Sequence, residues 1–228
     1  IAVLQNKNFT NYKAVGKLVN LEEKTKDFTT EGFAIGIGHT RWATHGKPTE
    51  LNAHPHLGES SYVVHNGIIE NYVELKHSLE ADGVKFLSQT DTEVIVHQFE
   101  KNLKSAKNAF EAFEKTISEL QGAYAILLVT KGEDETIFYA KHGSPMLIGV
   151  NEDNEKFFAS SDSPIIGLAK EVNYFEDGDY GYVTKEELVI YSKEGRKKEP
   201  VYSLLATDKL SAQKDGFRFF MEKEIYEQ

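Results

Sequence analysis

Arg41 is the residue of this sequence best suited to binding a small charged molecule. It stands in the polar segment His39–Gly46, directly after the apolar, glycine-containing run Phe33–Gly38, which predicts a buried strand. A guanidinium placed where a strand leaves the core can bind a carboxylate through two parallel hydrogen bonds. A lone arginine is more often a surface ion-pair partner. The polar neighbours favour a binding loop here: Trp42, Thr44 and His45.

A second polar segment, His65-Asn66-Gly67, has two interpretations. Asn-Gly between apolar runs is typical of a type I′ hairpin turn. The apolar residues after Gly67, however, recur at helical spacing, which favours a turn at the head of a helix. Such a turn leaves backbone N–H groups unpaired, and together with the Asn66 amide they could hold an oxyanion.

A third polar segment, Gln89–Glu93, contains Asp91. This carboxylate could stabilise the first turn of a following helix, bind an ammonium group, or do both. Arg41, Asn66-Gly67 and Asp91, in this order, suggest a site for a zwitterion with a reacting amide.

The histidines raise the hypothesis of a metal-dependent hydrolase, because His54 and His56 flank a proline. Further histidines lie nearby in the sequence: His39, His45 and His65. No carboxylate stands at a recognisable ligand spacing and no His-Glu-x-x-His motif occurs, so we expect hydrogen-bonded structural histidines, no metal and no cofactor. The run Gly36–Arg41 lacks the third glycine of a dinucleotide-binding fingerprint.

Composition narrows the function classes. The 228 residues carry a formal net charge of −10, which argues against nucleic-acid binding. The short basic run Arg196-Lys197-Lys198 predicts a solvated turn between strands. No apolar stretch of membrane-spanning length and no signal peptide is visible, so we expect a cytoplasmic protein that does not bind membranes. The sequence contains no cysteine, which excludes disulfides and a thiol nucleophile within these residues.

The periodicity predicts an α+β protein with sheets packed on each other and helices outside, as one domain over residues 1–228. Strand-like runs occur at Ile1–Leu4 and Phe33–Gly38. Three amphipathic helices are predicted after the polar loop. The first carries Ile68, Tyr72, Leu75 and Leu79 and ends at Asp82-Gly83. The second begins with a Thr90/Glu93 capping box and carries Ile95, Phe99 and Leu103, and the third carries Phe110, Phe113, Ile117 and Leu120. Seven short antiparallel strands then follow: 124–130, 136–140, 146–150, 156–159, 172–175, 180–184 and 188–191.

Several long motifs resemble the glutaminase domain of the glutamine:fructose-6-phosphate aminotransferases (isomerizing), the glucosamine-6-phosphate synthase family within the class II glutamine amidotransferases. The motifs are His39–Gly46, Asn52–His56, Val64–Asn71, Thr90–Glu93, Gly143-Ser144-Pro145, Ala159–Asp162 and Met221–Gln228. Because they are distributed over essentially the whole chain, they distinguish this family from other class II amidotransferases such as asparagine synthetases.

The resemblance implies an N-terminal nucleophile (Ntn) hydrolase fold, a four-layer αββα sandwich of antiparallel sheets. It implies hydrolysis of L-glutamine and passage of ammonia to a C-terminal sugar isomerase domain, which binds fructose 6-phosphate, makes glucosamine 6-phosphate and forms homo-oligomers. Arg41 would bind the glutamine α-carboxylate and Asp91 the α-ammonium, assisted by Thr44 and His45. Asn66 and the Gly67 N–H would form the oxyanion hole, and Trp42 would lie at the mouth of the ammonia channel.

The sequence departs from the family at the nucleophile. The family uses a cysteine at the mature N-terminus whose own amine acts as base, whereas residue 1 here is Ile1. We therefore expect a fragment without the first strands and without the isomerase domain, inactive on its own. Two other classes stay open: a metal-dependent hydrolase and a non-catalytic amino-acid-binding domain. The glutaminase domain of another class II amidotransferase is a further alternative.

Overall fold

The computed structural model describes residues 1–41 and 46–205, so the predicted site residues Trp42, Thr44 and His45 lie outside the described residues. By its internal contacts the chain divides into two compact units. The first comprises Ile1–Ser144 with Glu176–Glu199, and the second comprises Pro145–Phe175 with Pro200–Gln228.

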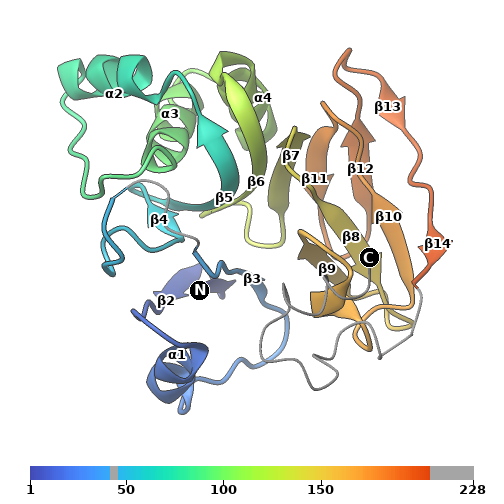
Figure 1. The fold of residues 1–228 in the computed structure, drawn as a ribbon. Helices are drawn as coiled ribbons and strands as arrows, with labels where there is room; N and C mark the ends of the chain where they lie inside the picture. Colours follow the sequence, from blue (N-terminus) through green and yellow to red (C-terminus); the bar gives the residue numbers. More distant parts are fainter. Residues whose placement is uncertain (42–45, 206–228) are drawn as a thin grey trace, which may run out of the picture. The chain divides into compact units, whose positions relative to one another are not determined.

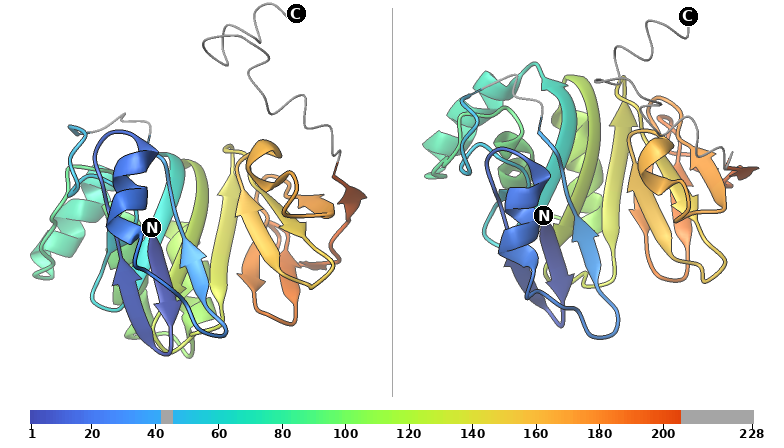
Figure 2. Two further views of the ribbon diagram at one scale, coloured as in Figure 1. Left: turned by 90° about the horizontal axis from the view of Figure 1, so that it is seen from below. Right: turned by 60° about the horizontal axis from the view of Figure 1, so that its bottom comes forward.

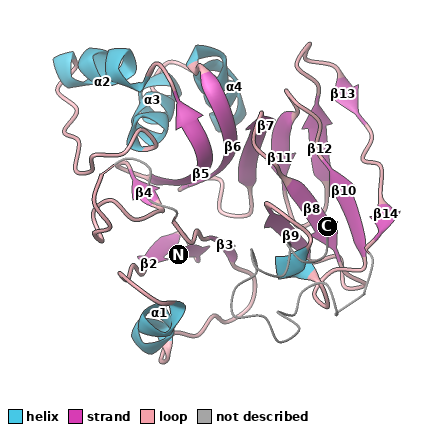
Figure 3. Cartoon of the chain, viewed as in Figure 1, coloured by secondary structure: helices cyan, strands magenta, loops and turns pink. Residues whose placement is uncertain are grey.

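The first unit is built on a seven-stranded sheet in which every neighbouring pair of strands is antiparallel (Figures 1 and 3). The order across the sheet is β13-β12-β11-β7-β6-β5-β4. The strands are β4 (His56–Leu57), β5 (Ser61–Ile69), β6 (Gly122–Thr130), β7 (Ile137–His142), β11 (Tyr180–Val183), β12 (Leu188–Tyr191) and β13 (Lys197–Lys198). The central pair, β5 and β6, is aligned without interruption from Ser61 opposite Thr130 to Ile69 opposite Gly122.

Both faces of this sheet are buried in the first unit. Side chains alternate between the faces of a strand, so Val63 packs on the helical side while Tyr62 and Val64 pack on the other. On that other side lies a small antiparallel sheet, β2-β1-β3, formed by β1 (Ala2–Gln5), β2 (Asn8–Asn11) and β3 (Ile35–Ile37). Its contribution to the core is apolar: Ala2, Leu4, Ile35 and Ile37.

Helices complete the layers of the first unit. The helical side of the main sheet is covered by α3 (Glu93–Leu103) and α4 (Ala109–Glu119), which bury Phe99 and Phe113, and α2 (Tyr72–Ala81) packs on α3. Helix α1 (Leu18–Thr25) lies on the far side of the small sheet (Figure 2). The unit therefore has the α-β-β-α order of layers.

The second unit contains a four-stranded antiparallel sheet of order β14-β10-β8-β9. Its elements are β8 (Leu147–Val150), β9 (Lys156–Ala159), the short 3₁₀ helix η1 (Ser163–Ile165), β10 (Glu171–Tyr174) and β14 (Ser203–Leu204). A small apolar core holds this sheet: Leu147, Ile165, Ala169, Val172 and Leu205.

Most of the predicted elements are confirmed. The seven strand-like runs between Tyr124 and Tyr191 correspond to β6 to β12, and the two N-terminal runs correspond to β1 and β3. The third predicted helix is α4, which begins after Asn108, whose side chain accepts a hydrogen bond from the Glu111 N–H at 2.8 Å. The first predicted helix does end where expected, since Ala81 is the last residue of α2 and Gly83 adopts a φ of +88°.

Two local predictions are wrong. Asn66-Gly67 is neither a hairpin turn nor the head of a helix, because β5 continues through Ile69 before α2 begins at Tyr72. The Thr90/Glu93 capping box is also absent: no side chain caps α3, and the Glu93 carboxylate accepts the N–H groups of Leu87 and Ser88 at 2.8 and 2.6 Å instead.

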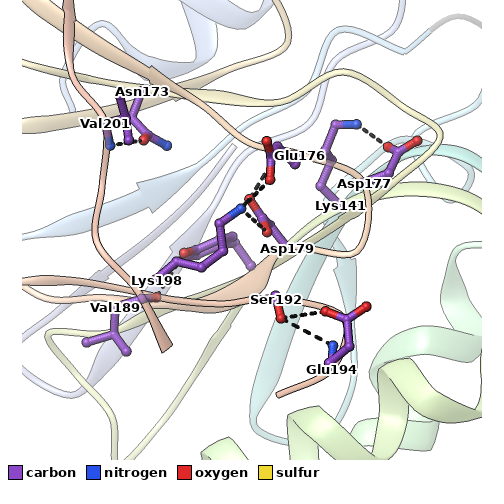
Figure 4. A network of polar contacts seen from close by, with 11 residues as sticks. Lys141, Asn173, Glu176, Asp177, Asp179, Val189, Ser192, Glu194, Lys198 and Val201 are labelled. Atoms are coloured by element: carbon purple, nitrogen blue, oxygen red, sulfur yellow. Dashed lines mark hydrogen bonds and ion pairs between the residues drawn. The ribbon is translucent and has the colours of Figure 1, made fainter. Parts of the chain in front are cut away.

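The basic run at residues 196–198 is only partly a solvated turn. Lys197 and Lys198 form strand β13, and the Lys198 ammonium lies 2.9 Å from Asp179 Oδ1 and also pairs with Glu176 (Figure 4). Asp179 is buried, so the lysine neutralises a carboxylate that the fold removes from water. Among the helices of the described residues, none is long and apolar enough to cross a bilayer.

Candidate active site

The four predicted site residues that the structure describes lie around one cavity of about 310 Å³ in the first unit. Arg41 follows β3, Asn66 and Gly67 belong to β5, and Asp91 precedes α3. The fold thus brings together three segments that are well separated in the sequence. Three histidines complete much of the wall: His39, His54 and His65.

Arg41 is oriented by the backbone of its own loop. Its Nη1 donates to the Lys47 carbonyl at 3.1 Å, and its Nη2 donates to the Gly46 carbonyl at 3.2 Å. These bonds fix the plane of the guanidinium at the cavity wall. A planar group held in this way is suited to binding a carboxylate, because little side-chain freedom remains to be lost on binding.

Gly67 occupies a position that only glycine fits. Its φ is +127°, and a Cβ built there would lie 2.0 Å from the Ala123 carbonyl oxygen of the neighbouring strand and 2.9 Å from Ser144 Oγ. Both the conformation and the contact exclude a side chain. The close pairing of β5 with β6 at this point of the cavity wall therefore requires glycine.

Asn66 lies beside Gly67 and faces the cavity from the same strand, opposite Ala125 of β6. Its side-chain oxygen, Oδ1, lies 2.6 Å from Nε2 of His39. An amide side chain next to a backbone N–H on a cavity wall is the type of pair that can stabilise a developing oxyanion.

Asp91 is 5% exposed and bonded to the strand that carries Asn66. Its Oδ2 accepts the Ile69 N–H at 2.8 Å, and no other hydrogen bond is made by this carboxylate to the described residues. Oδ1 is thus left for a ligand. Asp91 also stands just before the N-cap of α3, where the helix dipole favours a negative charge.

The histidines form a buried hydrogen-bonded cluster. Thr92 Oγ1 lies 3.0 Å from His54 Nε2 and 3.0 Å from His65 Nδ1, while His56 Nε2 lies 3.1 Å from Thr90 Oγ1. This agrees with the structural role expected for them. Among the described residues, no group of three or more His, Asp or Glu side chains is arranged to hold a metal ion.

Burial keeps these imidazoles neutral. Burial, and then the charge of Lys13, lowers the pKa of His56 to about 3. Burial also lowers the pKa of His65 to about 4, although the nearby Asp91 carboxylate acts in the opposite direction. For His54, burial and the neighbouring imidazoles lower the pKa well below its usual range. Arg41 and Asp91 therefore provide the formal charges of this wall near neutral pH.

The sequence did not indicate that His39 contacts Asn66. The two residues are separated by 26 others, and nothing in their spacing shows that the segment after β3 lies beside β5. Thr92 was likewise missed as the hydroxyl shared by two histidines.

Comparisons with known proteins give the family of the chain and its fold. The family model described as a glutamine amidotransferase domain matches residues 39–166. A Campylobacter jejuni protein named glutamine--fructose-6-phosphate aminotransferase (isomerizing) is 56% identical over 228 residues, which make up 100% of this chain and 38% of that protein. A Helicobacter pylori protein of the same name is 43% identical over 100% of this chain and 37% of its own length. The chain thus spans well under half the length of these relatives.

A solved structure with the same fold is the glutamine phosphoribosylpyrophosphate amidotransferase from B. subtilis. It superposes with a TM-score of 0.66 at 23% identity, over 91% of this chain and 43% of that one. The fold is that of the Ntn hydrolases, as the sequence predicted. The match of the family model over more than half of the sequence identifies the chain as a member of the glutamine amidotransferase domain family.

Proposed function

We propose that these residues form the glutaminase domain of a glutamine:fructose-6-phosphate aminotransferase. L-Glutamine is hydrolysed to glutamate and ammonia, and the ammonia passes to a sugar isomerase domain of the same polypeptide, which converts fructose 6-phosphate to glucosamine 6-phosphate. The observation that carries the proposal is the convergence of Arg41, Asn66-Gly67 and Asp91 on one cavity. The names of the relatives support the choice of acceptor sugar.

The zwitterionic end of glutamine determines how it binds. The Arg41 guanidinium pairs with the α-carboxylate, and Asp91 Oδ1 accepts from the α-ammonium. The neutral histidines between them add no positive charge that would repel the ammonium. Thr44, His45 and Trp42 are proposed to assist, the first two in binding glutamine and Trp42 at the mouth of the ammonia channel.

The side-chain amide of glutamine then lies toward Asn66 and Gly67. A cysteine thiol attacks the amide carbon, and the negative charge that develops on the carbonyl oxygen is stabilised by Asn66 Nδ2 and the Gly67 N–H. The amine departs as ammonia, and water hydrolyses the resulting thioester to glutamate. Since the 228 residues contain no cysteine, they bind, orient and stabilise but do not themselves supply the nucleophile.

The test is to incubate the complete protein that contains this chain with L-glutamine and fructose 6-phosphate, and to measure glutamate and glucosamine 6-phosphate together. We expect equal amounts of both products and no turnover with D-glutamine. Loss of activity on treatment with a metal chelator would favour a metal-dependent hydrolase. Glutamine binding without glutamate formation would favour an amino-acid-binding domain.

A further inference from the structure

The two ends of the Asn66 side chain have nearly the same shape but opposite hydrogen-bonding character. The Nδ2 end donates two hydrogens, while the Oδ1 end only accepts. An oxyanion is stabilised only if Nδ2 faces it, and Oδ1 in the same place would repel it. The contribution of Asn66 therefore depends on what fixes the rotation of its amide.

His39 is the one side chain among the described residues that hydrogen-bonds the Asn66 amide, through the 2.6 Å contact between Nε2 and Oδ1. The other ring nitrogen, Nδ1, is buried and has no partner within residues 1–41 and 46–205. A proton on Nδ1 would leave a buried donor unpaired and would point the lone pair of Nε2 at Oδ1. The proton is consequently on Nε2, which donates to Oδ1.

The charge of the ring agrees with this tautomer. Burial, opposed by the Asn66 contact and reinforced by the Arg41 charge, lowers the pKa of His39. The ring is therefore neutral near pH 7 and carries a single N–H.

The His39 ring is itself held in place. Its edge packs on the His54 ring, with centroids 4.2 Å apart and planes inclined by 75°. His54 is in turn bonded through Nε2 to Thr92 at the N-cap of α3. The ring thus has a second contact besides the Asn66 bond.

We propose that His39 is a positioning residue of this site, whose Nε2–H holds Asn66 Oδ1 so that Nδ2 faces the cavity as an oxyanion donor. The inference rests on the proposed glutaminase function. No proton moves in this role, because His39 keeps the same tautomer throughout the reaction.

The first test compares His39→Ala and His39→Gln in the complete protein, with glutamate release as the measured reaction. For His39→Ala we expect kcat to fall at least about 10-fold while KM for glutamine changes less than about twofold, since the oxyanion donor acts mainly after binding. His39→Gln retains an N–H donor at similar reach and should recover most of kcat. His77→Ala, at an exposed position on α2, is the matched control and should behave like the wild type.

The second test places His39→Ala in an Asn66→Ala background. If His39 acts through Asn66, the double variant should have the kcat of Asn66→Ala within about twofold, because the amide to be positioned is gone. Losses in kcat that multiply in the double variant would overturn the inference. A rise in KM of His39→Ala equal to its loss in kcat would also overturn it. So would a His39→Gln variant that has an unchanged unfolding midpoint but does not recover kcat.

The single variants separate the two proposals. Full turnover in Asn66→Ala would remove the oxyanion assignment itself, and the present inference with it. A large loss in Asn66→Ala together with full turnover in His39→Ala would leave the proposed function intact and remove only the role of His39.

Discussion

The described charged side chains of the site are anchored by hydrogen bonds to the main chain. Asp91 binds the Ile69 N–H through Oδ2 and has Oδ1 available, so its structural and ligand-binding interpretations are compatible. Arg41 likewise bonds two loop carbonyls while its guanidinium borders the cavity. Such anchoring orients a side chain before the ligand arrives, which reduces the entropy lost on binding.

Replacing Arg41 by lysine should weaken glutamine use more than it weakens folding. The charge stays, but the paired hydrogen bonds to a carboxylate are lost, which should cost about 1.5 to 3 kcal/mol in kcat/KM. Steady-state kinetics and thermal unfolding of the complete protein measure the two effects. Arg196→Lys, at an exposed position outside the cavity, is the matched control. An unchanged KM in Arg41→Lys, with reduced stability, would instead identify a purely structural arginine.

Asn66→Asp tests the donor with almost no change of shape. The carboxylate can still accept the His39 N–H, but it has no Nδ2 hydrogens and adds a negative charge where the oxyanion forms. We expect kcat to fall by roughly 100-fold or more with the unfolding midpoint nearly unchanged. Rapid-quench measurement of the thioester would locate the loss in the first chemical step. Full activity in Asn66→Asp would leave the Gly67 N–H as the remaining proposed donor.

The strands of the second half could be predicted from the sequence because each is short, rich in β-branched or aromatic residues, and bounded by turn residues. It failed at β5, where both faces are buried, so Val63 and Val64 are equally apolar and no alternation marks the strand. Asn66-Gly67 was therefore interpreted as a turn, although the glycine is required because a Cβ there would lie 2.0 Å from the Ala123 carbonyl oxygen. Helix α1 was missed, and it buries no side chain in the core. The site residues were found by residue type, whereas the His39–Asn66 contact depends on tertiary structure alone.

Gly67→Ala should destabilise the first unit more than the same replacement at another glycine with a positive φ. Gly132, in the turn after β6, has a φ of +92° and no atom within 4 Å of the position that a Cβ would take, so Gly132→Ala measures the backbone cost, on the order of 1 kcal/mol. Gly67→Ala adds the clash with Ala123, and we expect its loss in the free energy of unfolding to exceed that of Gly132→Ala by at least about 1 kcal/mol. Urea unfolding of both variants provides the comparison. Equal losses would show that β5 and β6 can separate locally at little cost.

The site depends on the layered construction of the first unit. His39 and Arg41 follow strand β3 of the small sheet, and Asn66 and Gly67 belong to strand β5 of the main sheet. Asp91 and Thr92 directly precede helix α3 of the helical layer. The buried histidines lie among these three elements, hydrogen-bonded to threonines rather than charged. Because burial keeps these imidazoles neutral in the folded state, the stability of the site depends on pH.

The free energy of unfolding should therefore fall as the pH is lowered from 7.5 to 5.5. In the folded state the pKa of His56 is about 3 and that of His65 about 4, whereas in the unfolded chain both return to about 6.5, so below that pH the unfolded state binds more protons. Each such histidine should lower the free energy of unfolding by about 1 kcal/mol between pH 7.5 and 5.5. Glu93 does not contribute to this dependence on pH. Burial acts to raise its pKa, but hydrogen bonds from His97, Leu87 and Ser88 lower the pKa to about 2. The stability that the ionised Glu93 provides is therefore lost only below about pH 4.5, outside this range.

Urea unfolding at pH 7.5, 6.5 and 5.5 of the wild type and His56→Gln isolates one member of the cluster. Glutamine cannot take up a proton here, and its amide can still meet Thr90, so the variant should lose about 1 kcal/mol less than the wild type between pH 7.5 and 5.5. His77→Gln, at an exposed position on α2, is the matched control. If His56→Gln and the wild type lose the same stability, His56 is protonated in the folded protein and the neutral cluster inferred here is wrong.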